Sequence, residues 1–183
     1  MQQIFLTLSI SLLLSACQQQ ASPTEYLRPS KDNDPTVLAY SYDYQVPQSR
    51  VCTLYVEHWQ GLIQKDKQPL LTLSEGEDTL SFWISTLDSG YDRYKASTSS
   101  GSNQVDFLYT PGLVSNFAWL TPTDWTSTYE SGELGNQEMI LFTSVRGNSF
   151  QISSVDCISP LTDPNVLENY QEVFLIRAVW SNT

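Results

Sequence analysis

Short stretches in which apolar and polar side chains alternate recur through most of the chain, and this pattern limits the possible folds more than any other feature. In one stretch, Leu38, Tyr40, Tyr42 and Tyr44 occupy every second position. Successive side chains on a β-strand point to opposite faces, so all four belong to one face of a strand. Three further stretches show the same period: Cys52, Leu54 and Val56; Leu80, Phe82 and Ile84; and Val105, Phe107 and Tyr109. The pattern predicts half-buried strands.

Two stretches, 139–145 and 173–180, are apolar on both faces, which is typical of strands that are covered on both sides. Clusters of turn-forming residues separate the stretches at short intervals. The best helical candidate is residues 164–170, because Asp163 is placed to cap a helix and Pro164 fits its first turn. No internal repeat or second domain boundary is visible. We therefore expect an all-β fold, a single-domain β-sandwich of short antiparallel strands with one short helix.

The N-terminal part of the chain carries a different signal. Residues 4–14 form an apolar run, long enough for the hydrophobic region of a signal peptide and short for a membrane-spanning helix. The run ends in Leu14-Ser15-Ala16-Cys17. This tetrad resembles the lipobox of bacterial lipoproteins, in which an apolar residue and two small residues precede a cysteine. The resemblance implies that residues 1–16 are a signal peptide that is removed, and that Cys17 carries a thioether-linked diacylglycerol.

Residues 17–35 are expected to tether a folded domain, residues 36–183, to the membrane. The segment is polar, contains three prolines and has no apolar periodicity, which is typical of a flexible linker. The lipoprotein resemblance implies a location on the extracytoplasmic side of a bacterial cell envelope, with the membrane as a partner through the lipid on Cys17. Gln18 follows the lipidated position, where inner-membrane lipoproteins tend to have aspartate. The resemblance therefore implies the outer membrane if the envelope has one.

Two cysteines remain when Cys17 is lipidated, namely Cys52 and Cys157. An extracytoplasmic location permits oxidation and the remaining number is even, so we expect a disulfide bond between them. Such a bond would close a loop of about 100 residues and stabilise the fold by up to roughly 4–5 kcal/mol. The alternative is two separate buried thiols, which pack as small apolar side chains.

The charge of the chain is strongly negative, with nine Lys and Arg against 20 Asp and Glu and a formal net charge of −11. This balance argues against a nucleic-acid partner, because such proteins need a basic surface. The acidic residues gather at expected turns, where charges are solvated, and no group has the spacing of a calcium-binding loop. The clusters are Glu75, Glu77 and Asp78; Asp88 and Asp92; and Glu130 and Glu133.

Recognisable catalytic motifs are missing from the sequence. The single histidine, His58, excludes motifs that need two, and no nucleophile elbow, P-loop or dinucleotide fingerprint occurs. His58 falls on the inward face at the end of its strand, beside Trp59, so we interpret it as a partly buried structural residue. We predict no catalytic residue, no metal site and no cofactor. A triad assembled from distant residues stays open as an alternative.

The remaining candidates for ligand binding are aromatic. Trp119, Trp125 and Tyr129 lie in a segment rich in Thr, Ser and Pro, and aromatic rings beside polar loops stack on sugars or anchor protein partners. The alternative is that the two tryptophans fill the end of the core. We expect a non-enzymatic binding module for an envelope glycan or an envelope protein. The other two hypotheses are a structural or assembly lipoprotein of an envelope complex and a hydrolase of envelope polymers.

Overall fold

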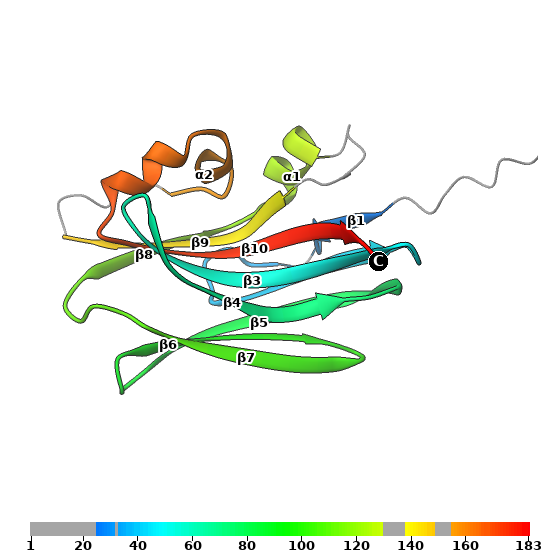
Figure 1. Ribbon diagram of the computed structural model, residues 1–183, viewed down its shortest axis with the longest axis horizontal. Coiled ribbons are helices and arrows are strands. Elements are labelled where there is room, and N and C mark those ends of the chain that lie inside the picture. Colours follow the sequence, from blue (N-terminus) through cyan, green and yellow to red (C-terminus); the bar gives the residue numbers. More distant parts are fainter. Residues whose placement is uncertain (1–24, 32, 130–137, 149–154) are drawn as a thin grey trace, which may run out of the picture.

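The architecture is a sandwich of two β-sheets, as the alternation predicts (Figure 1). The computed structural model describes residues 25–31, 33–129, 138–148 and 155–183, so the leader, Cys17, Glu130 and Glu133 lie outside the described residues. Within these ranges, ten strands form two five-stranded sheets and the helices are short. The elements are, in chain order, β1 (Tyr26–Pro29), β2 (Ala39–Val46), β3 (Arg50–Gln60), β4 (Ile63–Leu73), β5 (Gly76–Leu87), β6 (Tyr91–Thr98), β7 (Gly101–Leu108), β8 (Val114–Trp119), α1 (Pro122–Tyr129), β9 (Glu138–Gly147), α2 (Ser159–Thr162), η1 (Pro164–Asn169) and β10 (Glu172–Asn182).

All strand pairings within the described sheets are antiparallel. The first sheet has the order β1-β2-β5-β6-β7, and the second has the order β4-β3-β10-β9-β8. The chain passes from the first sheet to the second between β2 and β3 and returns between β4 and β5. The C-terminal strand β10 lies at the centre of the second sheet, between β3 and β9. It therefore joins the early and late halves of that sheet.

Side chains from the inner faces of the two sheets form one core, and the predicted alternation is confirmed on β2, β3 and β5, except that Leu38 precedes β2 and is 37% exposed. In the fourth predicted row, Phe107 is buried, whereas Val105 and Tyr109 are half-buried. The tyrosine row of β2 (Tyr40, Tyr42 and Tyr44) is buried, so it is a wall of the core. The hydroxyl of Tyr42 donates to the carbonyl of Leu141 at 2.6 Å, which satisfies this buried polar group. The other periodic rows of β3 and β5 are buried as well: Cys52, Leu54 and Val56, and Leu80, Phe82 and Ile84.

Two strands of the second sheet, β9 and β10, are covered on both faces. Residues 155–171, which contain α2 and η1, lie on the face of this sheet that points away from the first sheet (Figure 1). Pro160 and Leu167 of this segment are buried. Most residues of β9 and β10 are buried on both sides, because one face packs in the core and the other packs under the segment. The prediction of doubly covered strands at 139–145 and 173–180 is confirmed.

The expected helix at 164–170 is present as the 3-10 helix η1. The side chain of Asp163 accepts a hydrogen bond from the Asn165 amide at 3.1 Å, as expected of a cap. The helix α1 was not expected, although its start carries a signal. The Thr121 hydroxyl accepts from the Asp124 amide at 3.2 Å and donates to the Asp124 carboxylate at 2.7 Å. The first of these bonds is an N-cap interaction, which satisfies a backbone amide in the first turn of the helix.

The boundary of the folded domain needs a correction. Strand β1 lies inside residues 17–35, which were expected to form only a tether, and it pairs with β2 from Tyr26↔Gln45 to Pro29↔Tyr42. Leu27 of this strand is fully buried in the core. The sandwich therefore includes residues from Tyr26 onward, because burial of one leucine and four paired positions outweigh the polar composition around them.

The expected disulfide bond is wrong, since Cys52 and Cys157 are both free thiols. Cys52 points into the core from β3. Cys157 lies against the other face of the second sheet, with its Sγ 3.7 Å from the Thr143 hydroxyl of β9 and 3.4 Å from the Ala118 carbonyl. Strand β10 separates β3 from β9, and two strand spacings amount to about 10 Å, whereas a disulfide needs Cα atoms within roughly 7 Å. Burial raises the pKa of both thiols.

The two ends of the sandwich carry different parts of the chain. At one end, which we call the Ser49 end, Glu25 pairs with Arg50 at 3.5 Å, and the Thr183 amide donates to the Ser49 carbonyl at 3.0 Å. The start of β1 and the C terminus therefore lie together there, at the right of Figure 1. At the opposite end, which we call the His58 end, β3 turns into β4, β5 turns into β6, and β10 begins.

Candidate functional site

The two tryptophans that were predicted to bind a ligand do not form an exposed aromatic surface. Trp119 is 1% exposed, its ring stacks on Tyr40 at 4.9 Å, and its Nε1 donates to the Val37 carbonyl at 3.0 Å. Trp125 is half-buried against the core. Tyr129 is the last residue of α1, and its side chain lies outside the described part of the structure. The assignment of Trp119 to ligand binding is therefore wrong, and the alternative of a core residue is confirmed.

Polar side chains converge instead on a cleft of about 580 Å³ at the His58 end. The end of β3, the β5–β6 turn, the end of β7 with the loop after it, and the start of β10 surround it. We call it the His58 cleft, and its lining includes His58, Gln60, Tyr91, Leu108, Thr110 and Glu172. Its volume falls within the range of small-molecule sites, about 300–1,000 Å³.

His58 and Glu172 form the floor of the His58 cleft. The period of the strand places His58 on the inner face of β3, and Phe174 of the antiparallel β10 lies opposite. The two rings stack with their centroids 4.5 Å apart. Glu172 lies two residues before Phe174 and therefore points to the same face, where it is 3% exposed. Its Oε1 lies 3.7 Å from Nε2 of His58.

Donors from two other segments hold the carboxylate of Glu172. The Thr110 amide donates to Oε2 at 3.0 Å, the Thr110 hydroxyl donates to Oε1 at 2.7 Å, and Nε2 of Gln60 donates to Oε1 at 3.4 Å. Burial by itself raises the pKa of Glu172, but the nearby His58 and the Thr110 hydrogen bonds outweigh burial and lower the pKa to about 2. The carboxylate is therefore charged at neutral pH.

Acid is expected to remove a contribution that Glu172 makes to stability. Its pKa is about 2 in the folded chain against an ordinary 4.5, so the contribution is complete above pH 4.5 and is lost as the pH falls from 4.5 toward 2. Its full size is about 3 kcal/mol. Urea unfolding between pH 7 and pH 3 follows the larger part of this loss, and Glu172→Gln should flatten the profile. The matched control is Glu75→Gln at an exposed turn, and equal flattening in both variants would contradict the assignment.

A buried ion pair lies behind the floor of the His58 cleft. Asp92 of β6 and Arg146 of β9 reach from opposite sheets and pair in the core, where neither is more than 6% exposed. Thr86 donates to Asp92 at 2.8 Å, and the Arg146 guanidinium lies 3.8 Å from the ring centre of Tyr109. The expectation that Asp92 is a solvated turn charge is wrong, because it lies on the inner face of β6 in phase with the buried Tyr94.

Large apolar side chains remain exposed around the His58 end. Tyr91 and Leu108 face each other across β6 and β7 and line the cleft, and they are 37% and 59% exposed. Leu62 and Ile63 at the β3–β4 turn are 45% and 62% exposed. A cleft with a charged floor therefore has apolar walls and apolar surroundings, a combination that marks binding surfaces.

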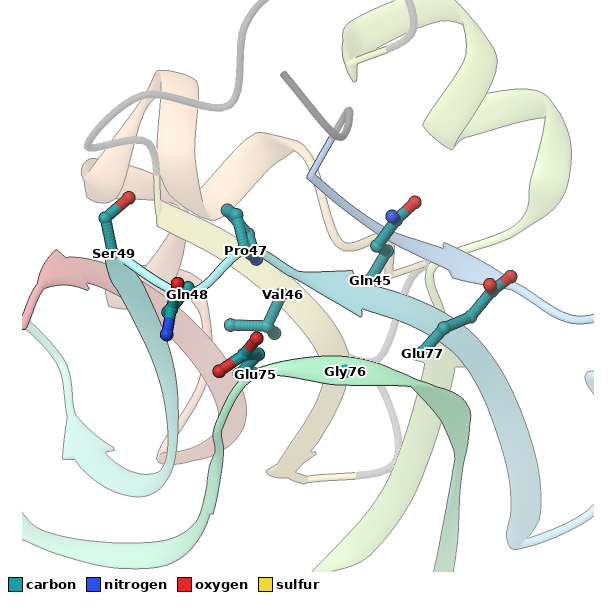
Figure 2. A pocket seen from close by; sticks show the side chains of 8 residues that line it. All are labelled: Gln45, Val46, Pro47, Gln48, Ser49, Glu75, Gly76 and Glu77. Atoms are coloured by element: carbon teal, nitrogen blue, oxygen red, sulfur yellow. The ribbon is translucent and has the colours of Figure 1, made fainter. Parts of the chain in front are cut away.

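A second cavity of about 640 Å³ lies at the Ser49 end, between the β2–β3 turn and the start of β5 (Figure 2). Its charged side chains, Glu75 and Glu77, are exposed, and Figure 2 shows them on opposite sides of Gly76. Glu77 accepts a hydrogen bond from the Tyr26 hydroxyl at 2.7 Å. These diverging carboxylates do not converge on one point. The prediction of solvated acidic groups is confirmed for Glu75 and Glu77, whereas Asp78 of the same cluster is half-buried on β5 and accepts hydrogen bonds from Ser99.

No protein-family model, curated protein or solved structure matches this chain. Among the residues that the structure describes, none of the helices has the length and apolar character needed to cross a membrane. In the same residues, no group of three or more His, Cys, Asp or Glu is placed to hold a metal ion.

Proposed function

We propose that this chain is a lipid-anchored binding protein of a bacterial cell envelope and that its ligand occupies the His58 cleft. The lipobox-like tetrad Leu14-Ser15-Ala16-Cys17 supports the anchor. The observation that carries the binding role is the polar floor of the cleft, formed by Glu172 and His58, together with the Asp92–Arg146 ion pair buried behind it in the core. An apolar set of the same volume would serve packing as well or better. Buried ionisable groups beside a cleft of this size are typical of a recognition site.

The position of the cleft fits an anchored protein. Glu25, at the Ser49 end, lies only eight residues after Cys17 in the sequence, and eight residues span at most about 28 Å. The Ser49 end is therefore the end nearer the membrane under this proposal. The His58 cleft opens at the opposite end, where a ligand in the envelope reaches it without obstruction by the bilayer.

Binding fits the chemistry of the cleft better than hydrolysis does. A glycoside hydrolase needs one carboxyl group whose pKa is raised so that it donates a proton near neutral pH. The two carboxyl groups of the cleft with shifted pKa values have lowered pKa values, not raised ones. Glu172 has a pKa of about 2, and a hydrogen bond from Arg93 lowers the pKa of Asp106.

A fractionation and capture experiment tests the proposal. The full chain, extracted in mild detergent, is incubated with purified cell wall, envelope polysaccharides and solubilised envelope proteins. We expect one of these to be retained, and the double variant Tyr91→Ala with Leu108→Ala to lose about tenfold in retention because two walls of the cleft are removed. Trp83→Ala, which alters an exposed aromatic side chain of β5, is the control. Cys17→Ala should move the chain out of the membrane fraction.

Two outcomes would count against the proposal. Retention that is equal in the cleft variant and in Trp83→Ala would place the ligand elsewhere on the surface. Membrane retention of Cys17→Ala would contradict the lipid anchor. The two outcomes are independent, so the anchor and the cleft are tested separately.

A further inference from the structure

We infer that the His58 cleft receives a lysine side chain of a partner protein, whose ammonium group reaches Glu172. The inference rests on the proposed function and names the chemistry of the ligand. It follows from the balance of charge on the floor, from the hydrogen bonds that Glu172 leaves open, and from the walls of the cleft.

The floor of the cleft carries one negative charge more than its fixed cations balance. Asp92 and Arg146 pair with each other, which leaves Glu172. The group opposite Glu172 is His58, whose Nε2 lies 3.7 Å from Oε1, beyond ordinary hydrogen-bond distance. At the mouth, Asp66 and Asp106 add acidic groups, of which Asp106 is paired with Arg93. The acidic groups of the floor and the mouth therefore attract a cation that a ligand delivers.

The carboxylate of Glu172 has room for a further donor. A carboxylate has about four acceptor positions. Among the described residues, Oε1 accepts from the Thr110 hydroxyl and from Gln60, whereas Oε2 accepts only from the Thr110 amide. One position on Oε2 therefore stays open. A compact ammonium group matches a single position, whereas the planar fork of arginine is suited to two adjacent ones.

The walls of the cleft fit a long apolar stem. Tyr91, Leu108, Tyr109 and Pro111 line the passage above the floor. Four methylene groups of a lysine side chain bury against such surfaces while the charged end reaches a polar site. Arg146 already lies over the ring of Tyr109 at 3.8 Å, so a cation is accepted next to these aromatic walls. Apolar surface exceeds polar surface in the lining of the cleft, which favours an apolar stem over an amino sugar with several hydroxyl groups.

The experiment titrates the full chain, in mild detergent, with three small probes and follows binding by calorimetry. The probes are Nα-acetyl-lysine methylamide, the matched norleucine derivative with a comparable apolar stem and no ammonium group, and glucosamine. We expect the lysine derivative to bind with a Kd on the order of 1 mM. The norleucine derivative should bind about tenfold more weakly, because it lacks the charged hydrogen bond. Glucosamine has an ammonium group but no apolar stem, and it should also bind about tenfold more weakly.

Three variants locate the binding. Glu172→Gln should weaken the lysine derivative about tenfold, since it removes the negative charge of the floor. Tyr91→Ala, at an exposed wall, keeps the test valid if Glu172→Gln does not fold, and it should weaken binding several-fold. Glu75→Gln removes one acidic group from the Ser49 end and should leave binding unchanged.

Several results would overturn the inference. Equal binding of lysine and norleucine derivatives would mean an apolar pocket, and tighter binding of glucosamine would mean a glycan site. Lysine binding that survives Glu172→Gln and Tyr91→Ala would mean attraction to the acidic surface in general, and no binding of any probe would also count against it. A glycan captured by the full chain and lost in the cleft variant would leave the proposed function standing while this inference fails.

Discussion

Replacing Trp119 with alanine is expected to lower the free energy of unfolding by about 3–5 kcal/mol, which is the usual cost of deleting a fully buried large aromatic side chain. Trp119 is 1% exposed, and its ring contacts Tyr40 at 4.9 Å, Phe142 at 4.5 Å and Phe82 at 6.1 Å between centroids. The variant also leaves the Val37 carbonyl without the indole donor. Thermal unfolding followed by circular dichroism should show a midpoint lower by on the order of 10 °C.

The control for this change is Trp83→Ala. Trp83 is 44% exposed on the outer face of β5, so its removal should cost less than about 1 kcal/mol. A comparable loss of stability in both variants would contradict the core assignment of Trp119. If Trp119→Ala left the melting point unchanged but abolished ligand binding, Trp119 would belong to the binding surface, as the sequence alone predicted.

The difference between the two tryptophans shows what strand periodicity predicts and what it leaves open. Tyr42, Leu54 and Phe82 were assigned correctly, because period-2 alternation is a local property of one strand. Trp119 ends β8, an edge strand with few buried positions, and a polar segment follows it. Its burial depends on Tyr40, which is 79 residues away in the chain. Local composition therefore favoured an exposed loop.

The prediction of a disulfide bond was wrong for a related reason. Cys52 was correctly placed on the inner face of its strand, and the even number of cysteines favoured a bond. Parity does not say on which face of a sheet the second cysteine lies. Cys157 belongs to the segment that covers the outer face, and β10, the last strand in the sequence, separates the two thiols.

The sequence predicted one part of the candidate site and missed another. The inward phase of His58 was predicted, and the structure confirms its stacking on Phe174. Glu172 was not singled out, because an acidic residue before an apolar run is typical of a strand boundary. Its donor Thr110 lies 62 positions earlier in the chain, which no local pattern connects. Asp92 carried a signal that was not used: Tyr94 and Ala96 follow it at period 2 and are buried.

Breaking the ion pair behind the cleft is the second change with a large expected effect. Asp92→Ala leaves the Arg146 guanidinium 6% exposed and without its carboxylate. Removing one partner of a buried pair typically costs about 3–5 kcal/mol, because the other charge stays buried. The aromatic contact of Arg146 with Tyr109 remains but offsets only a part of this cost. Urea unfolding at pH 7 should show a clearly lower midpoint than that of the unmodified chain.

The double variant Asp92→Leu with Arg146→Met separates charge burial from packing. It replaces the pair with apolar side chains, and such replacements are often neutral or stabilising, so the unfolding midpoint should recover most of the loss. Asp106→Ala is the matched control, because Asp106 pairs with an arginine in the same way but at the surface, and its midpoint should hardly change. Recovery of stability in the double variant with weaker ligand retention would mean that Asp92 and Arg146 serve binding more than folding. A double variant that is as unstable as Asp92→Ala would instead make the pair a structural requirement of the sandwich, and the case for the His58 cleft would then rest on Glu172 and His58 alone.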